Sequence, residues 1–249
     1  MDAIGLTIVA GTFVLAGGVK GVIGLGLPTV SLAILTIAFD LTTAMALLLV
    51  PSFVTNVWQA LVGGEALNVI KRLWWFFTIA TATIWVGSLA LPAVDHQWLS
   101  ALLGLSLIIY ATIALSGAKL DLPKQHQTWA GGVAAAVNGI LAGMTGSFVV
   151  PGVMYLQSIG LSRTALIQAM GMLFTVSTAA LAVVLGNHGL LNADLGTVSL
   201  AALLPAIGGM MIGQKIRAQL SDATFRRVFF VSVFIVGLYI IGSTLLRSE

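Results

Sequence analysis

The stretch Gly17-Gly18-Val19-Lys20-Gly21-Val22-Ile23-Gly24-Leu25-Gly26-Leu27-Pro28 places one lysine, five glycines and a proline inside an apolar segment. Glycine and proline interrupt helices, and interrupted backbone at membrane depth persists only where protein or a water-filled cavity satisfies its polar groups. A weaker copy follows in the second half of the chain, from Asn138-Gly139-Ile140-Leu141-Ala142-Gly143-Met144-Thr145-Gly146-Ser147 to Pro151. We therefore expect two discontinuous helices that face each other around a transport site.

The composition indicates an integral membrane protein. Of the 249 residues, 59% are hydrophobic and 8% are charged, whereas a soluble domain carries roughly 25% charged residues. The net charge of +3 does not point to nucleic acid, because the few basic residues lie in short loops between apolar runs. The chain has no cysteine, and its three histidines lie in separate loops, so we expect no metal and no cofactor. The N-terminus lacks a basic region and is not a cleavable signal.

Apolar runs of about 20 residues, the length that crosses a bilayer, occur in the same order in both halves. Each half opens with an interrupted block and continues with three full spans. The blocks and spans are 4–39, 41–62, 73–94 and 99–117, then 129–160, 164–186, 195–213 and 228–246. The expected fold is an all-α polytopic membrane protein with two inverted repeats, each a broken or re-entrant helix hairpin plus three transmembrane helices. We place the repeats at 1–118 and 129–249, joined by a cytoplasmic linker at 119–128.

The distribution of charge decides the topology. If each interrupted block dips in and returns, or crosses twice, the loop cations gather on one face, namely Lys71, Arg72, Lys119, Lys124, Arg163, Lys215, Arg217, Arg226 and Arg227. The opposite face then holds a single basic residue, Arg247, and the carboxylates of Asp2, Asp40, Asp95, Asp194 and Glu249. The positive-inside rule favours this arrangement. It makes the number of crossings per half odd, so the repeats are inverted and both termini face outward, into the periplasm.

Lys20 is the one charged residue deep inside an apolar segment. A lysine at the centre of a membrane helix costs roughly 2.5–3.5 kcal/mol on insertion scales. The functional interpretation is attraction of an anionic substrate or a proton-linked charge. The alternative is a structural cation that carbonyls of the broken helix satisfy, or one that snorkels to the surface.

The glycines also allow two interpretations. Gly17 and Gly21 have the small-xxx-small spacing that lets helices approach closely. Adding Gly24, Gly26 and Pro28 argues against a continuous helix, and the free N–H groups of a half-helix N-terminus bind anions. We therefore predict that Lys20 and the backbone of Gly21, Gly24 and Gly26 bind substrate.

The span after each interrupted block carries a polar stripe. Ser52, Thr55, Asn56 and Gln59 share one helix face, and Thr164, Gln168, Thr175 and Thr178 do much the same in the second half. Such side chains face the interior of a bundle, where they either line a pathway or join helices by hydrogen bonds. We predict that the site includes Asn56, Gln59, Asn138, Thr145, Gly146, Ser147, Gln168 and Thr175.

Catalysis is not expected. Ser147 follows Gly146, and a serine hydrolase would need His188, which lies in a predicted outward loop without an acidic partner. Asp40 and Asp194 are most simply helix-start caps at the outer border.

At these residues the chain resembles the sulfite exporter (TauE/SafE) family of bacterial membrane transporters. The similarity rests on Val19-Lys20-Gly21-x-x-Gly24-x-Gly26-x-Pro28, on the echo Gly139-x-x-x-Gly143-x-x-Gly146, and on Pro151 to Gly160 followed by Arg163. The second copy departs from the glycine-rich pattern, since Phe148, Val149 and Val150 precede Pro151. The resemblance implies movement of small sulfur-containing anions, such as sulfite, thiosulfate or an organosulfonate like sulfoacetate, across the bacterial inner membrane.

We thus expect a secondary transporter, an exporter that works by alternating access, with substrate bound between the two interrupted segments. A passive anion channel and a non-transporting membrane scaffold are the alternatives. The expected partners are the lipid bilayer and a small anion, without nucleic acid. Pairing with a second copy, the coupling ion, the direction and the identity of the anion stay open.

Overall fold

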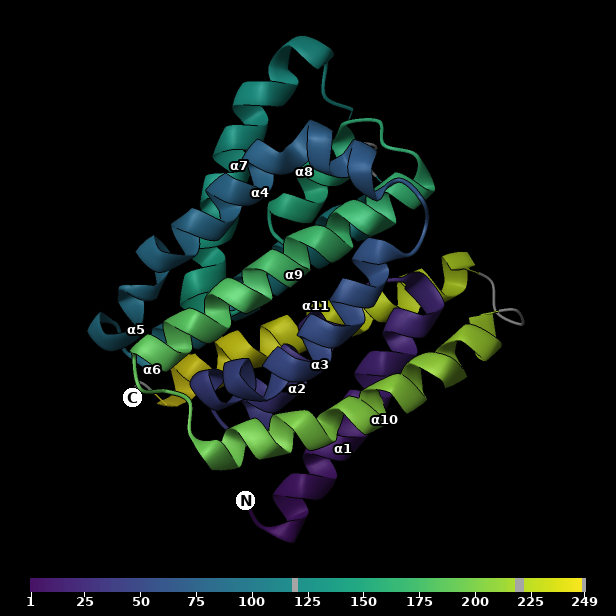
Figure 1. Ribbon diagram of the computed structural model, residues 1–249. Helices are drawn as coiled ribbons and strands as arrows, with labels where there is room; N and C mark the ends of the chain where they lie inside the picture. The colour runs from purple at the N-terminus through teal and green to yellow at the C-terminus, as the bar shows by residue number, and fades with distance from the viewer. Residues whose placement is uncertain (118–120, 218–221, 248–249) are drawn as a thin grey trace. The chain divides into compact units, whose positions relative to one another are not determined.

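The computed structural model describes residues 1–117, 121–217 and 222–247, which form helices and no strand (Figure 1). The helices are α1 (Ala3–Ile23), α2 (Leu27–Ala38), α3 (Leu41–Leu61), α4 (Ala66–Ser88), α5 (Ala90–Ala93), α6 (His96–Ser116), α7 (Lys124–Thr145), α8 (Gly152–Ser158), α9 (Arg163–Asn187), α10 (Ala193–Arg217) and α11 (Asp222–Arg247).

Seven segments in these described ranges are long and apolar enough to cross a membrane: α1, α3, α4 with α5, α6, α9, α10 and α11. This confirms the predicted all-α polytopic class. The interrupted blocks combine a long helix with a short one. At 1.5 Å per residue, the 21 residues of α1 reach about 31 Å, the thickness of the hydrocarbon core. The 12 residues of α2 and the 7 of α8 are too short to cross alone.

Short polar side chains begin many of these helices, as the sequence predicts. The carboxylate of Asp40 accepts a hydrogen bond from the N–H of Thr43 (2.9 Å), which confirms its role as a cap. The same prediction for Asp194 is wrong. Asn192 accepts from the N–H of Leu195 (2.7 Å), and Asp194 lies in the first turn of α10, where its charge favours the helix dipole.

Two helices begin before their apolar runs. α4 starts at Ala66, so Lys71 and Arg72 belong to a helix and not to a loop. α7 starts at Lys124, inside the predicted linker, while Lys119 lies outside the described residues. Lysine and arginine are good helix formers, and their long stems reach water from within a helix. A hydropathy boundary therefore marks the edge of the apolar core and not the end of the helix.

The helices form two compact units, and each takes helices from both halves of the sequence. Unit 1 comprises Met1–Pro51, Val94–Gly117 and Gly189–Glu249, and unit 2 comprises Ser52–Ala93 and Ala118–His188. The division falls inside α3, directly after Pro51. The inverted relation of the repeats stays a prediction.

In unit 1, α1 and α2 form a hairpin. A Cβ on Gly5 would lie 3.5 Å from the ring of Phe39, the residue after α2, so the two open ends of the hairpin lie together. α1 also packs along α10 (Figure 1). Gly17 lies against Ala206 and Gly21 against Met210 and Gln214, so contacts advance together along both helices. The two helices therefore run parallel.

Unit 2 repeats this arrangement with different helices. The N–H of Leu122, just before α7, donates to the carbonyl of Ser158 at the end of α8 (3.0 Å), so α7 and α8 also form a hairpin. α7 packs along α4 (Figure 1). Gly139 lies against the Ala80 carbonyl and Gly143 against the Ile84 carbonyl, which makes this pair parallel as well.

Glycine is required in both helix pairs because the backbones touch. A Cβ on Gly17, Gly139 or Gly143 would overlap a carbonyl oxygen of the facing helix. Membrane helices gain van der Waals contact by such close approach, since lipid provides little hydrophobic drive between helices. The packing interpretation of Gly17 and Gly21 is therefore sufficient to explain their positions in α1.

Candidate substrate site

The first interruption lies at Gly24–Gly26, so the predicted break is confirmed but is shorter than the glycine-rich stretch. α1 continues through Gly17 to Ile23. Gly24 ends it in the left-handed region (φ 77°), and its N–H donates to the Lys20 carbonyl at 2.8 Å. Gly26 is also left-handed (φ 108°), and Pro28 lies in the first turn of α2. Glycine adopts these φ values without a steric penalty, and proline suits the first turn of a helix.

The second interruption has the same C-cap. Gly146 ends α7 at φ 72°, and its N–H donates to the Ala142 carbonyl at 2.8 Å. Gly146 therefore corresponds to Gly24, and Ala142 to Lys20. The link to α8 then runs through buried Phe148 and a cis Val150–Pro151 bond.

Lys20 is 5% exposed and lies in the last turn of α1, directly before the break. A cation at this position interacts favourably with the helix C-terminus, which agrees with the structural interpretation. Beyond the break begins α2, whose N-cap Gly26 provides no side-chain acceptor. A helix N-terminus without a side-chain acceptor attracts anions, so the functional interpretation has the same geometry behind it.

The α7–α8 link is held by Asn138. Its Oδ1 accepts the N–H of Gly152, the first residue of α8, at 3.0 Å. The Thr145 hydroxyl donates to the Leu141 carbonyl (2.7 Å) and accepts from the N–H of Ser147 (3.3 Å). These predicted site residues therefore shape the interruption, and all three polar side chains are buried.

Gln59 and Gln168 join α3 to α9 within unit 2. Gln59 Nε2 donates to the Ile167 carbonyl (2.9 Å), and Gln168 Nε2 donates to the Ala60 carbonyl (3.0 Å). Gln168 Oε1 also accepts the N–H of Glu65 (2.7 Å). Both ends of the Gln168 amide are thus engaged by the protein, which agrees with the helix-joining interpretation of the two glutamines.

The rest of the polar stripes is mostly buried, as predicted. Ser52, Thr55 and Asn56 of α3 are at most 2% exposed. On α9, Thr178 is buried and Thr175 is half-buried, and the Thr175 hydroxyl donates to the Gly171 carbonyl of its own helix. Thr164, by contrast, is exposed.

Ser199 is a buried polar residue that the sequence analysis missed. Pro51 has no N–H, so the Leu47 carbonyl of α3 cannot receive its usual helical hydrogen bond. The Ser199 hydroxyl of α10 donates to that carbonyl at 2.9 Å and accepts the N–H of Val50 at 3.1 Å. A proline inside a predicted membrane helix signals that a donor must come from elsewhere, but it does not say from where.

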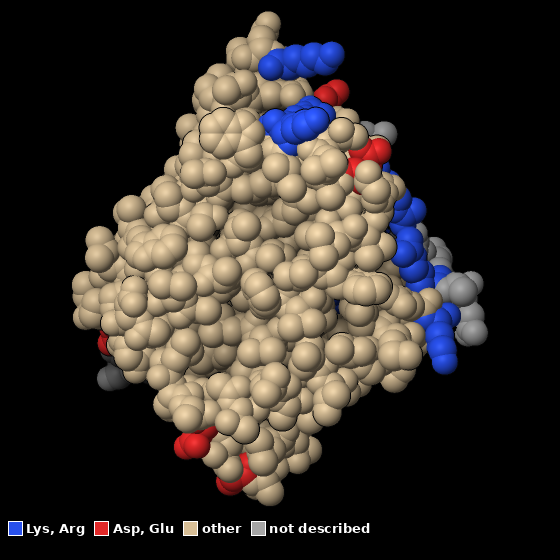
Figure 2. Space-filling view, viewed as in Figure 1, with Lys and Arg blue, Asp and Glu red and all other residues tan. Residues whose placement is uncertain are grey.

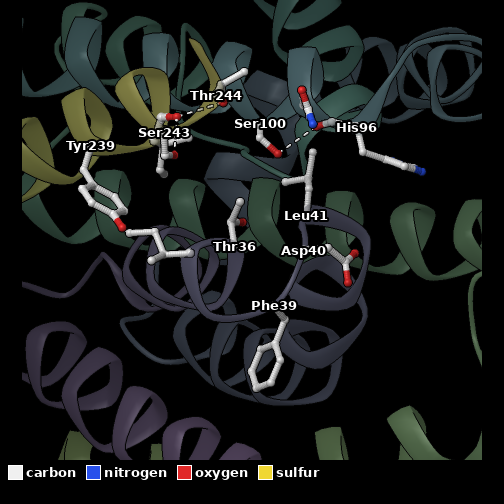
Figure 3. Close-up of a pocket in the computed structure, with 12 residues that line it drawn as sticks. Thr36, Phe39, Asp40, Leu41, His96, Ser100, Tyr239, Ser243 and Thr244 are labelled. Atoms are coloured by element: carbon white, nitrogen blue, oxygen red, sulfur yellow. Dashed lines mark hydrogen bonds between the residues drawn. The ribbon is translucent and has the colours of Figure 1, made fainter. Parts of the chain in front are cut away.

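A pocket of about 130 Å³ in unit 1 was also missed (Figure 3). It lies among the end of α2, the start of α6 and the last turns of α11, lined by Thr36, Asp40, His96, Ser100, Tyr239 and Ser243, among others. Burial alone would raise the pKa of the Asp40 carboxyl, but hydrogen bonds from Thr42 and Thr43 outweigh it and lower that pKa below its usual value. The pocket contains none of the predicted site residues. It could not be predicted from the sequence, because the residues that line it come from three segments that are distant in the sequence.

Charge separates along the helices of unit 1. Because α1 and α10 run parallel, Asp2 and Asp194 lie at one end of the pair, and Lys215 and Arg217 at the other. Figure 2 shows red side chains where α1 and α10 begin and blue ones where α10 ends. The open end of the α1–α2 hairpin is thus the acidic end of unit 1.

In unit 2 the open end of the hairpin is basic. Arg72 donates to the carbonyl of Ile159, directly after α8, at 2.7 Å, and Lys124 begins α7 at the same end. The hairpins of the two units therefore differ in the charge at their open ends.

Comparison with known proteins gives one match. The model of a protein family described as Sulfite exporter TauE/SafE matches residues 9–240, nearly the whole chain. The match includes both interruptions and every predicted site residue. Searches of the curated proteins and of the solved structures find no match.

Proposed function

The chain belongs to the sulfite exporter TauE/SafE family of membrane transporters, and we propose that it exports a small sulfur-containing anion across the bacterial inner membrane by alternating access. Sulfite, thiosulfate and an organosulfonate such as sulfoacetate are the candidate substrates. The observation that carries the proposal is the buried cation Lys20, one turn before a helix interruption after which α2 begins without a side-chain cap.

In this proposal Lys20 and the backbone at Gly26 attract the anion in unit 1, whereas Gly24 adds no donor because its N–H donates to the Lys20 carbonyl. The interrupted segment of unit 2, Asn138 to Ser147, presents polar groups of its own. Interrupted helices in corresponding positions of two sequence halves are typical of transporter binding sites. A buried lysine costs roughly 2.5–3.5 kcal/mol on insertion scales, and a bound anion offsets part of that cost. Gly21 contributes less, because α10 covers it.

The charges at the helix ends support the proposed topology. By the positive-inside rule, the acidic end of unit 1, where the chain starts, faces the periplasm. The hairpin of unit 1 opens at an acidic end and that of unit 2 at a basic end, which supports inverted repeats. Each interrupted block, α1 with α2 and α7 with α8, ends at the same end of its unit at which it begins. This supports an odd number of membrane crossings in each half.

Reconstituted liposomes test the function. Liposomes that contain the purified protein should take up labelled sulfite, thiosulfate or sulfoacetate, with rates that saturate and with counterflow of labelled substrate. Saturation without counterflow would indicate a channel, and absence of both for every anion would indicate a scaffold. Lys20→Met should abolish uptake while Lys71→Met, a change at an exposed lysine of α4, leaves it unchanged. Equal uptake by the two variants would refute the role of Lys20.

A further inference from the structure

Four side chains in unit 2 are buried with a polar atom that has no hydrogen-bond partner among the described residues. The atoms are Ser52 Oγ, Asn138 Nδ2, Ser177 Oγ and Thr178 Oγ1, and each residue is at most 1% exposed. Leaving a buried donor or acceptor unsatisfied costs about 1–3 kcal/mol, and most buried polar groups do find a partner. Four such atoms in one unit indicate a partner that is not part of the chain.

Asn138 presents its amide nitrogen as a donor. Because Oδ1 accepts the N–H of Gly152 (3.0 Å), the orientation of the amide is fixed and Nδ2 carries the two free hydrogens. A Cβ on Gly152 would lie 2.6 Å from Asn138 Oδ1 and 3.1 Å from Leu173 Cδ2. Asn138 therefore lies beside α9 at the level of Leu173.

The hydroxyls of α9 lie one turn further along. Ser177 follows Leu173 by four residues, and Thr178 follows Phe174 by four, so each lies on the same helix face as that neighbour. The α7–α8 link covers this part of α9, because the rings of Phe148 and Phe174 are 6.3 Å apart. Asn138 and the two hydroxyls thus face one stretch of the interior of unit 2.

Ser52 reaches the same level from α3. Gln59 bonds the carbonyl of Ile167 and Ala60 accepts from Gln168, while Gly63 lies against Thr164. Residue numbers fall along α3 as they rise along α9, so the helices are antiparallel. Gly171 of α9 lies against Gln59 and Ala60. Ser52 lies about two turns before Ala60, and Ser177 and Thr178 lie about two turns after Gly171.

These groups form a set of donors without charge. The described charged residues of unit 2, namely Glu65, Lys71, Arg72, Asp121, Lys124 and Arg163, all lie near helix starts or in loops. Fixed neutral donors in a site that excludes water stabilise oxygen atoms that share a negative charge. The hydroxyls of Ser52, Ser177 and Thr178 both donate and accept, whereas the Asn138 amide nitrogen only donates. A sulfonate or sulfite group, with several acceptor oxygens, is therefore the ligand that can satisfy all four.

We infer that Asn138, Ser177 and Thr178, with Ser52 opposite them, form a charge-neutral site in unit 2 that binds the oxygens of a small oxoanion. The inference rests on the proposed function for the choice of anion. It adds three residues to the predicted site, Ser52, Ser177 and Thr178, and it assigns to Asn138 the role of a donor. Recognition of the oxygens then does not depend on Lys20.

The test uses the full chain in detergent with sulfoacetate, sulfite and sulfate as probes, and measures affinity by calorimetry and thermal stability without a probe. Ser177→Ala combined with Thr178→Val removes two unpartnered hydroxyls, so affinity should fall at least about tenfold while the Tm without a probe stays equal or rises. Asn138→Asp keeps the acceptor for Gly152 but removes the donor, and binding should be lost. Ser158→Ala is the matched control, because the buried Ser158 hydroxyl already donates to the Tyr155 carbonyl, and it should bind like the wild type.

Each outcome decides one question. Wild-type affinity in the Ser177→Ala/Thr178→Val variant, or absence of binding of all three probes by the wild type, would overturn the neutral site. A fall in Tm in that variant equal to the fall in Ser158→Ala would also overturn it, because the hydroxyls would then have partners in the protein. Binding that the variant loses, in a protein that transports none of the anions, would refute the proposed function and leave the site standing.

Discussion

Replacing Gly24 by alanine tests whether a left-handed residue ends α1. Gly24 has φ 77°, and a Cβ placed on it would meet no atom within 4 Å. The cost of Gly24→Ala is therefore conformational and not steric, about 1–2 kcal/mol for an L-residue in this region. That cost lowers the ratio of folded to unfolded protein by a factor of about 5–30.

Gly11→Ala is the matched comparison, because Gly11 lies inside α1 and its Cβ would also meet nothing within 4 Å. There alanine should stabilise by roughly 0.5–1 kcal/mol. Denaturant unfolding in detergent should thus separate the two variants by about 1.5–3 kcal/mol. Gly24→Asn should lie between them, since asparagine visits the left-handed region more readily than alanine. Equal stability of Gly24→Ala and Gly11→Ala would refute the assigned break.

Three further measurements follow from the structure. Ser199→Ala leaves the Leu47 carbonyl without its donor and should destabilise the folded protein by about 1–3 kcal/mol. Adding Pro51→Ala should recover much of this loss, because the alanine restores a helical N–H. Additive stability effects of the two substitutions would contradict the role of Ser199. Hydrogen bonds lower the pKa of the Asp40 carboxyl, so the ionised carboxylate stabilises the fold above the unfolded pKa of about 3.9, and this contribution is lost as pH falls through the lower folded pKa. Asp40→Asn should therefore reduce the difference in stability between pH 7 and pH 3, measured by thermal unfolding. An unchanged difference would exclude this role of Asp40. Because the chain has no cysteine, single cysteine replacements report the membrane topology directly. Asp194→Cys should react with a membrane-impermeant maleimide applied from the periplasm, whereas Lys215→Cys should react only after the membrane is opened. The reverse labelling would overturn the proposed orientation.

The interruptions were predictable because their cause is local. Gly24, Gly26 and Pro28 break a helix through their own φ preferences and the missing N–H of proline, whatever lies around them. The same holds for Gly146, which ends α7 four residues after the position that corresponds to Lys20. The break is nevertheless narrower than the glycine-rich stretch, because Gly17 and Gly21 serve the contact with α10.

The partners of the polar residues were not predictable, because they depend on helices that are distant in the sequence. A stripe such as Ser52, Thr55, Asn56 and Gln59 shows that one face is turned inward, but the same stripe suits a ligand and a neighbouring helix equally well. The geometry separates the cases residue by residue. Gln168 has both ends of its amide engaged by α3 and the α3–α4 link, whereas Ser52 on that same stripe has a buried hydroxyl without a partner in the described chain.

The distinction between engaged and unengaged polar groups bears on how a transporter of this kind releases its substrate. A charged site alone binds an anion tightly and favours retention, because separating a buried pair of opposite charges is strongly unfavourable. Neutral hydroxyls and an amide lose less on release, since water can replace the anion at each donor. The Lys20→Met variant should therefore lose uptake but retain measurable binding of sulfoacetate or sulfite through Asn138, Ser177 and Thr178 of unit 2. Complete loss of binding in Lys20→Met, with the protein folded, would show that the charge alone holds the substrate.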